Sequence, residues 1–109
     1  MTISADDLAE LRALCPGATH LSEGGCGFVD LPALKIQVGQ ENVVRDALLS
    51  LQAHSGYTSR LYLSAAIPSR GINWTTHTVF GRCWHTPSWN NVMPARPIEM
   101  LQQHLQVYR

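Results

Sequence analysis

Strand-like segments follow one another through the middle of this chain, and helix-like segments stand at its two ends. The stretch Leu34–Val38 alternates apolar and polar side chains, which is typical of a half-buried strand. Residues 26–31 alternate more weakly, residues 60–64 fit a strand, and residues 74–80 are rich in β-branched and aromatic side chains. Because the strands come in a run instead of alternating with helices, the order predicts an α+β fold with an antiparallel meander of about four strands.

Both ends of the chain carry signals for a helix. Ser4, followed by an acidic first turn, predicts a helix over residues 5–14 that ends at the breakers Pro16 and Gly17. The last helix is expected to begin near Pro97, because proline is favoured in a first turn. Its buried face is expected to comprise Ile98, Leu101, Leu105 and Tyr108.

Two stretches are harder to assign. Residues 41–53 fit a helical stripe and also a short buried strand, and periodicity alone leaves both interpretations open. Residues 81–97 contain Gly81, Pro87, Pro94 and Pro97, so we expect a long irregular loop before the last helix.

Composition excludes several classes of function. A length of 109 residues fits one domain over 1–109. Eight basic and eight acidic residues give zero net charge and no basic run, which argues against nucleic-acid binding and leaves a homodimer as a candidate state. No apolar stretch approaches the roughly 18 residues of a membrane helix. Three cysteines without a C-x-x-C motif are expected to be free thiols of a cytoplasmic protein.

Cys83 is the candidate nucleophile. It lies between aromatic residues in a segment punctuated by glycine and proline, and a positive Arg82 or His85 beside it would favour the reactive thiolate. His85 is two residues away, so it shares a face with Cys83 if the chain is extended. The alternative is that Cys83 is a small core residue, because cysteine is among the most buried residue types.

The neighbouring aromatic and polar residues suggest a binding surface. Trp84 and Trp89 are candidate recognition residues, with Arg82 and Asn90 beside them, although such tryptophans more often lock a loop onto a core. A zinc site would need His77, Cys83, His85 and a distant donor such as Cys26. This spacing matches no standard zinc signature, so neither a metal nor another cofactor is expected.

The order of elements and the C-terminal landmarks resemble the ubiquitin-conjugating enzyme superfamily, particularly its small, divergent bacterial members. The matching run is His77, Gly81-Arg82-Cys83, Trp89, Pro94 and the helix from Pro97. His77 is followed by Thr78-Val79, so the asparagine that polarises the thioester in that family has no match here. The resemblance also assigns residues 46–52 to the third strand.

The resemblance implies a transferase in which Cys83, with His85 and His77 nearby, accepts a ubiquitin-like C-terminus as a thioester and passes it to an amine. The partners implied are a ubiquitin-like protein and its activating enzyme, and no metal or nucleotide is needed. A second hypothesis is a non-catalytic protein-binding module of the same fold, acting through the Trp84–Trp89 loop or a dimer surface. A third is a small thiol- or zinc-dependent hydrolase that uses Cys83 and a histidine.

Overall fold

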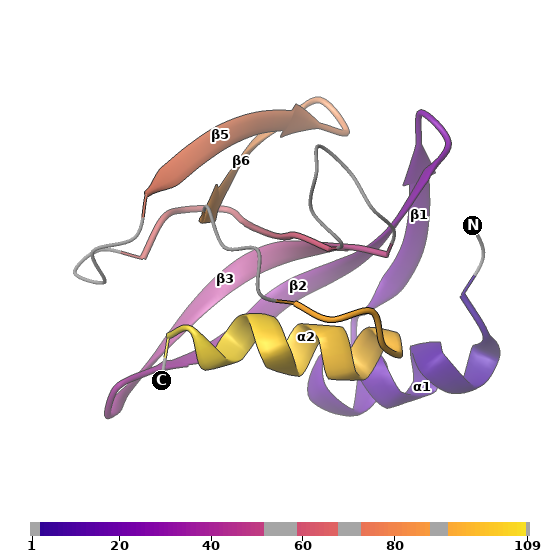
Figure 1. Ribbon diagram of the computed structural model, residues 1–109, viewed down its shortest axis with the longest axis horizontal. Coiled ribbons are helices and arrows are strands. Elements are labelled where there is room, and N and C mark those ends of the chain that lie inside the picture. Colours follow the sequence, from indigo (N-terminus) through magenta and orange to yellow (C-terminus); the bar gives the residue numbers. More distant parts are fainter. Residues whose placement is uncertain (1–2, 52–58, 68–72, 88–91, 109) are drawn as a thin grey trace.

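A computed structural model describes residues 3–51, 59–67, 73–87 and 92–108. Within these ranges the chain forms two helices and a six-stranded antiparallel sheet, which confirms the α+β class and contains more strands than expected (Figure 1). The elements are α1 (Ala5–Leu14), β1 (Thr19–Glu23), β2 (Cys26–Val38), β3 (Glu41–Ser50), β4 (Leu61–Leu63), β5 (Trp74–Val79), β6 (Arg82–Pro87) and α2 (Pro97–Gln106). Neither helix is long and apolar enough to cross a membrane.

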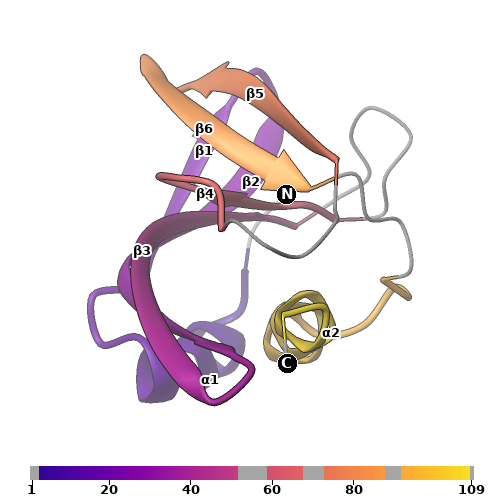
Figure 2. The ribbon, with the colours of Figure 1, turned by 90° about the vertical axis from the view of Figure 1, so that its left-hand side faces the viewer.

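The strands lie in the order β1-β2-β3-β4-β6-β5. The first four form a meander, after which the chain moves to the far edge of the sheet and returns as β6 between β5 and β4. Both helices lie on one side of the sheet, whereas the β5–β6 hairpin lies on the other side of the molecule (Figure 2). The hairpin is therefore held mainly by its own pairing and by the short strand β4.

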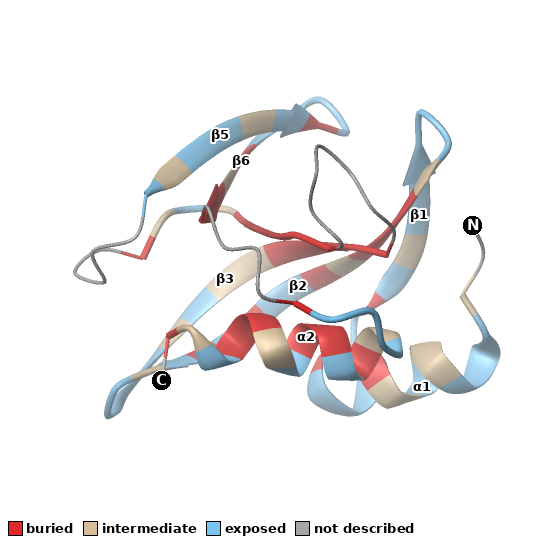
Figure 3. Cartoon of the chain, viewed as in Figure 1, coloured by how far each residue is buried: buried red, intermediate tan, exposed pale blue. Residues whose placement is uncertain are grey.

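The two faces of the sheet have different cores. The helix-covered face contains seventeen buried residues, mostly aliphatic, to which α2 contributes Ile98, Leu101 and Leu105 as expected. The opposite face has a smaller cluster of five buried residues that we call the aromatic face: Phe28, Leu48, Tyr62, Val79 and Trp84. Buried positions line the middle of the sheet and the inner side of α2, and β1 and β5 are largely exposed (Figure 3).

Strand β2 joins the two segments that the sequence suggested separately. Its register shifts between Leu31 and Leu34, where Ala33 has a positive φ of 53°. The Ala33 N–H donates to the Asp46 carboxylate at 3.0 Å. Such a bulge adds residues to one strand, so that Leu31 and Leu34 both face the helices although they are three positions apart.

Three expectations are corrected. Residues 41–50 form strand β3, so the helical interpretation of that stretch is wrong. The irregular loop expected over 81–97 is wrong for Arg82–Pro87, which is strand β6. Strand β1 was not expected, because four of its five residues are exposed and its sequence carries no apolar alternation.

Two tight turns close the outer hairpins of the sheet. Gly24 and Gly25 between β1 and β2 have φ of 59° and 80°, and Phe80 and Gly81 between β5 and β6 have φ of 52° and 69°. Two successive residues with positive φ form a type I′ turn, whose twist matches the twist of the flanking strands. The Phe80 N–H donates to Glu23 Oε2 at 2.8 Å, so the tips of the two hairpins are in contact. The two edge strands of the sheet, β1 and β5, therefore approach each other at this end.

Candidate functional site

Strand pairing decides which side chains surround Cys83. In the β5–β6 register Cys83 lies opposite Thr78, and His85 lies opposite Thr76. Directly paired residues of antiparallel strands project to the same side, and residues two apart along a strand do so as well. These four residues therefore form one row, which we call the thiol side of the hairpin: Thr76, Thr78, Cys83 and His85.

His77 lies on the other side of the hairpin. It is paired with Trp84, and its ring lies 5.7 Å from the Tyr62 ring, centroid to centroid. Its Nε2 is 3.1 Å from the Thr75 hydroxyl. The structure thus brings His85 to the side of Cys83 and separates His77 from both of them.

Cys83 is the most accessible of the three thiols. Its residue is exposed, whereas Cys26 is half-buried and Cys15 is buried. The Cys15 thiol donates to the Pro32 carbonyl at 3.1 Å, and burial raises the pKa of Cys15. A thiol in that setting is inert, so Cys15 is excluded, and Cys83 is more open to chemistry in solution than the half-buried Cys26.

The backbone of Cys83 also points away from β5. A two-residue turn closes on a hydrogen-bonded pair, here Val79 and Arg82, and such pairs alternate along an antiparallel ladder. The Thr78–Cys83 pair is therefore of the open kind, with its N–H and C=O groups directed outward. On that side β6 pairs with β4 at one position, Leu63 with His85.

Arg82 and Trp84 are structural in their contacts. Trp84 is 3% exposed, and its indole N–H donates to the Val79 carbonyl at 3.0 Å. The Arg82 guanidinium lies 4.5 Å from the Trp84 ring centroid and 3.2 Å from Asp46 Oδ2. The pKa of Asp46 is lowered, first by the hydrogen bond from the Ala33 N–H and then by Arg82. Trp84 is therefore no exposed recognition residue, and Trp89 and Asn90 lie outside the described residues.

A buried hydroxyl–imidazole pair was not singled out from the sequence. Ser59 Oγ donates to the Ser50 carbonyl at 2.8 Å and lies 3.0 Å from His104 Nε2. Because a hydroxyl has one proton, His104 Nε2 must be the donor in the second contact. Burial, with a smaller contribution from Arg60, lowers the pKa of His104 to about 4, so the imidazole is neutral at pH 7. Only the helical spacing of His104 with Leu101 and Leu105 could have indicated burial.

No group of three or more histidine, cysteine or acidic side chains is placed to hold a metal ion within the part of the chain that the structure describes. His77 and the pair Cys83 and His85 face opposite sides of the hairpin, which removes the geometry that a shared zinc ion would need. The thiol side thus offers a nucleophile and an imidazole, without a metal cluster among the described residues.

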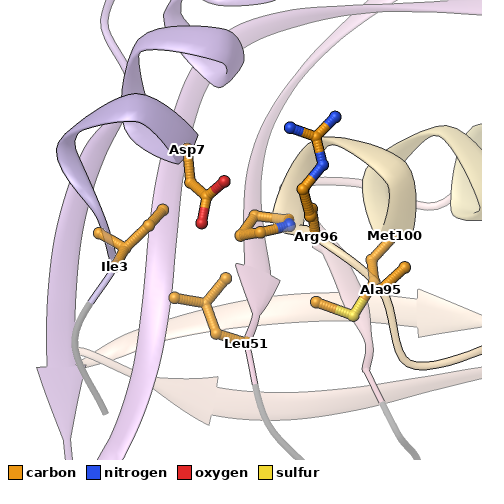
Figure 4. A pocket seen from close by; sticks show the side chains of 7 residues that line it. Ile3, Asp7, Leu51, Ala95, Arg96 and Met100 are labelled. Atoms are coloured by element: carbon orange, nitrogen blue, oxygen red, sulfur yellow. The ribbon is translucent and has the colours of Figure 1, made fainter.

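Two cavities stand out among the described residues. One, of about 310 Å³, lies between the starts of α1 and α2, where Ile3, Leu51 and Met100 provide apolar walls. Figure 4 shows the Arg96 guanidinium directed away from Leu51 and Met100, and it is bound to Glu10 at 2.7 Å. The other, of about 280 Å³, lies between the tips of the two outer hairpins. Neither cavity is lined by Cys83.

Comparison of the chain with protein-family models, with curated proteins and with solved structures gives no match.

Proposed function

We propose that this protein is a ubiquitin-conjugating-like carrier, in which Cys83 holds a ubiquitin-like C-terminus as a thioester. The observation that carries the proposal is the exposure of Cys83 on a side of the hairpin that it shares with His85. A helix, an antiparallel meander and a C-terminal helix agree with the coarse architecture that the resemblance implies.

The proposed transfer has two acyl exchanges. The Cys83 thiolate attacks the thioester carbonyl on the loaded activating enzyme, and the thiolate of that enzyme leaves. An amine then attacks the carbonyl held on Cys83, the amine loses a proton to a base, and Cys83 leaves as a thiolate. His85 is the base in this scheme, because its imidazole lies on the same side of β6 as the thiol. His77 has no part in it.

The test is transthiolation from a ubiquitin thioester of 2-mercaptoethanesulfonate to the folded protein, followed on non-reducing gels. We expect a product that excess thiol reverses, that Cys83→Ala abolishes and that Cys26→Ala retains. His85→Gln should leave the rate of its formation unchanged and slow its discharge to added lysine at least about a hundredfold, the low end of general-base effects. A product that persists in Cys83→Ala, or a Cys83 that alkylates rapidly yet accepts no acyl group, would overturn the proposal.

A non-catalytic binding module is the second candidate. One observation favours it: Cys83 lies in a paired strand with one imidazole on its side, instead of in a loop with the full set of groups that the resemblance implies. Such a module would not use the Trp84 ring, which is buried. It would bind its partner equally well with Cys83→Ala, whereas a carrier would lose its covalent adduct.

A further inference from the structure

The cavity between the hairpin tips is built from three separate parts of the sheet. The first hairpin contributes Glu23, Gly24, Cys26 and Phe28, the second contributes His77, Thr78 and Val79, and Tyr62 of β4 completes the lining. Its volume of about 280 Å³ lies just below the range of roughly 300–1,000 Å³ that is usual for small-molecule sites. The cavity therefore suits one long side chain better than a cofactor.

The lining combines aromatic rings with one formal charge. The Phe28 and Tyr62 rings meet edge to face at 6.3 Å, and Tyr62 meets His77 in the same manner at 5.7 Å. Glu23 is the one acidic or basic side chain, other than the imidazole, among the residues that line this cavity. Methylene groups pack well on such rings, and a carboxylate favours a cation. The Arg60 guanidinium already lies 6.0 Å from the Tyr62 ring centroid, so a bound cation is expected at Glu23 and not over that ring.

The hydrogen bonding of the Glu23 carboxylate favours an ammonium group over a guanidinium group. Its Oε2 accepts the Phe80 N–H at 2.8 Å, which fixes the carboxylate at the rim and leaves Oε1 for a ligand. An arginine fork binds best to two free carboxylate oxygens, whereas an ammonium is a point charge that needs one. An anion would meet an uncompensated carboxylate, because Arg82 is paired with Asp46 instead.

The rim of the cavity points to a protein as the source of the ammonium. Leu21, which is paired with Phe28, and Phe80 are 38% and 36% exposed. Phe80 holds a φ of 52°, a conformation that glycine adopts without strain at the matching turn. Strain in a bulky residue persists where its contacts require it, and here the ring lies 5.6 Å from that of Phe28. Exposed apolar side chains around the cavity would contact residues next to the bound one.

We propose that the cavity between the hairpin tips binds the side chain of a lysine on a partner protein, with the ammonium on Glu23 and the methylenes against Phe28 and Tyr62. This site is separate from Cys83, whose side chain lies on the thiol side of the hairpin. The inference does not depend on the proposed carrier function.

The test is titration of the isotope-labelled protein with capped tripeptides, read from the amide signals of Gly24, Cys26 and Thr78. Acetyl-Leu-Lys-Leu-methylamide should give saturable shifts, and replacing its lysine by norleucine or arginine should weaken binding at least about tenfold. Glu23→Gln should weaken it similarly, because the amide oxygen still accepts the Phe80 N–H while the charge is lost. Glu41→Gln, an exposed change at the β2–β3 turn, and Cys83→Ala should leave it unchanged.

Several outcomes would overturn this inference. Absence of saturable shifts removes the site, and equal binding of the norleucine or arginine peptide removes the preference for an ammonium. If butylamine binds as tightly as the tripeptide, the ligand is a free amine and the partner protein is not needed. Because Cys83→Ala tests the carrier separately, failure of one proposal is distinguishable from failure of the other.

Discussion

The two faces of the sheet differ in both size and chemistry. The helix-covered face has seventeen buried residues, mostly aliphatic, and the aromatic face has five, three of them aromatic. Both helices pack on the first, while among the described residues the second is covered by the return of the β5–β6 hairpin and retains a cavity. A core of close-packed aliphatic side chains supplies stability, and a thin aromatic layer with a cavity leaves room for a ligand.

Two adjacent residues of β3 provide the most direct test of whether the two faces differ in their contribution to stability. Leu49 belongs to the helix-covered face and Leu48 to the aromatic face, and they are 0% and 1% exposed. We expect Leu49→Ala to lower the free energy of unfolding by about 3–5 kcal/mol and Leu48→Ala by about 2–3 kcal/mol, since the cost depends on how far the surroundings can relax. Urea denaturation monitored by circular dichroism measures both.

The control for this pair is Val44→Ala, at a β3 position that is 53% exposed. Its effect should stay within about 0.5 kcal/mol. Equal losses for Leu48→Ala and Leu49→Ala, or a larger loss for Leu48→Ala, would show that the aromatic face contributes as much stability as the helix-covered one.

The pH dependence of stability probes His104, a buried imidazole of α2. The pKa of His104 is lowered from 6.5 to about 4, so the unfolded chain takes up a proton below pH 6.5 and the folded chain does not until about pH 4. The free energy of unfolding should therefore fall as pH falls through this window. At 1.36 kcal/mol per unit, the loss is about 2 kcal/mol at pH 5 and about 3 kcal/mol at pH 4.

Urea midpoints at pH 7, 6 and 5 measure this effect. The matched variant is His104→Gln, which keeps a hydrogen-bond donor near Ser59 and removes the titrating group. Its stability should vary less between pH 7 and 5, whatever its absolute value. A wild-type profile as flat as that of the variant would mean that His104 takes up its proton without unfolding.

The correct predictions, the helix boundaries and the buried face of α2, depend on sequence signals that lie close together in the chain. Helix α1 begins at the capping residue Ser4 and ends before Pro16 and Gly17, and α2 begins at a proline, so α1 over Ala5–Leu14 and the start of α2 at Pro97 were confirmed. The stripe Ile98, Leu101 and Leu105 was also confirmed as buried. Each of these features depends on residues within a few positions of one another, which is the range over which sequence patterns act.

The misses depend on contacts that are distant in sequence. Gly81 and Pro87 were interpreted as loop residues, but Gly81 completes a turn and Pro87 ends β6 opposite Trp74. That pair is of the open kind, where proline loses no ladder hydrogen bond. The turn also sets the register that turns His77 away from Cys83, and a one-residue difference would have put them on the same side. Gly81, the turn signal nearest to Cys83, does not by itself fix which two residues form the turn.

Substitutions at the two hairpin tips are expected to change the free energy of unfolding least. They also test whether Phe80 contributes to stability or to recognition. Phe80→Gly removes a strain of about 1–2 kcal/mol but loses the ring contact with Phe28, worth about 0.5–1.5 kcal/mol, and adds backbone entropy to the unfolded chain. The net change in the free energy of unfolding should lie within about 1 kcal/mol of zero. Phe80→Ala loses the same ring and keeps the positive φ, so it should be less stable than Phe80→Gly by about 1 kcal/mol.

Gly24→Ala provides the matched measurement in the other turn, where φ is 59° and no atom lies near an added methyl group. It should lose about 1 kcal/mol through strain alone. If Phe80→Ala proves as stable as Phe80→Gly, the turn has relaxed and the strain at Phe80 is not retained for contact. If the predicted order holds while Phe80→Gly weakens binding of the lysine tripeptide, the ring at this tip contributes little to stability and serves recognition. That outcome would mean that the two faces have different roles. The helix-covered core would supply most of the stability, and this stability would allow the aromatic face to keep a strained residue at its rim and an open cavity.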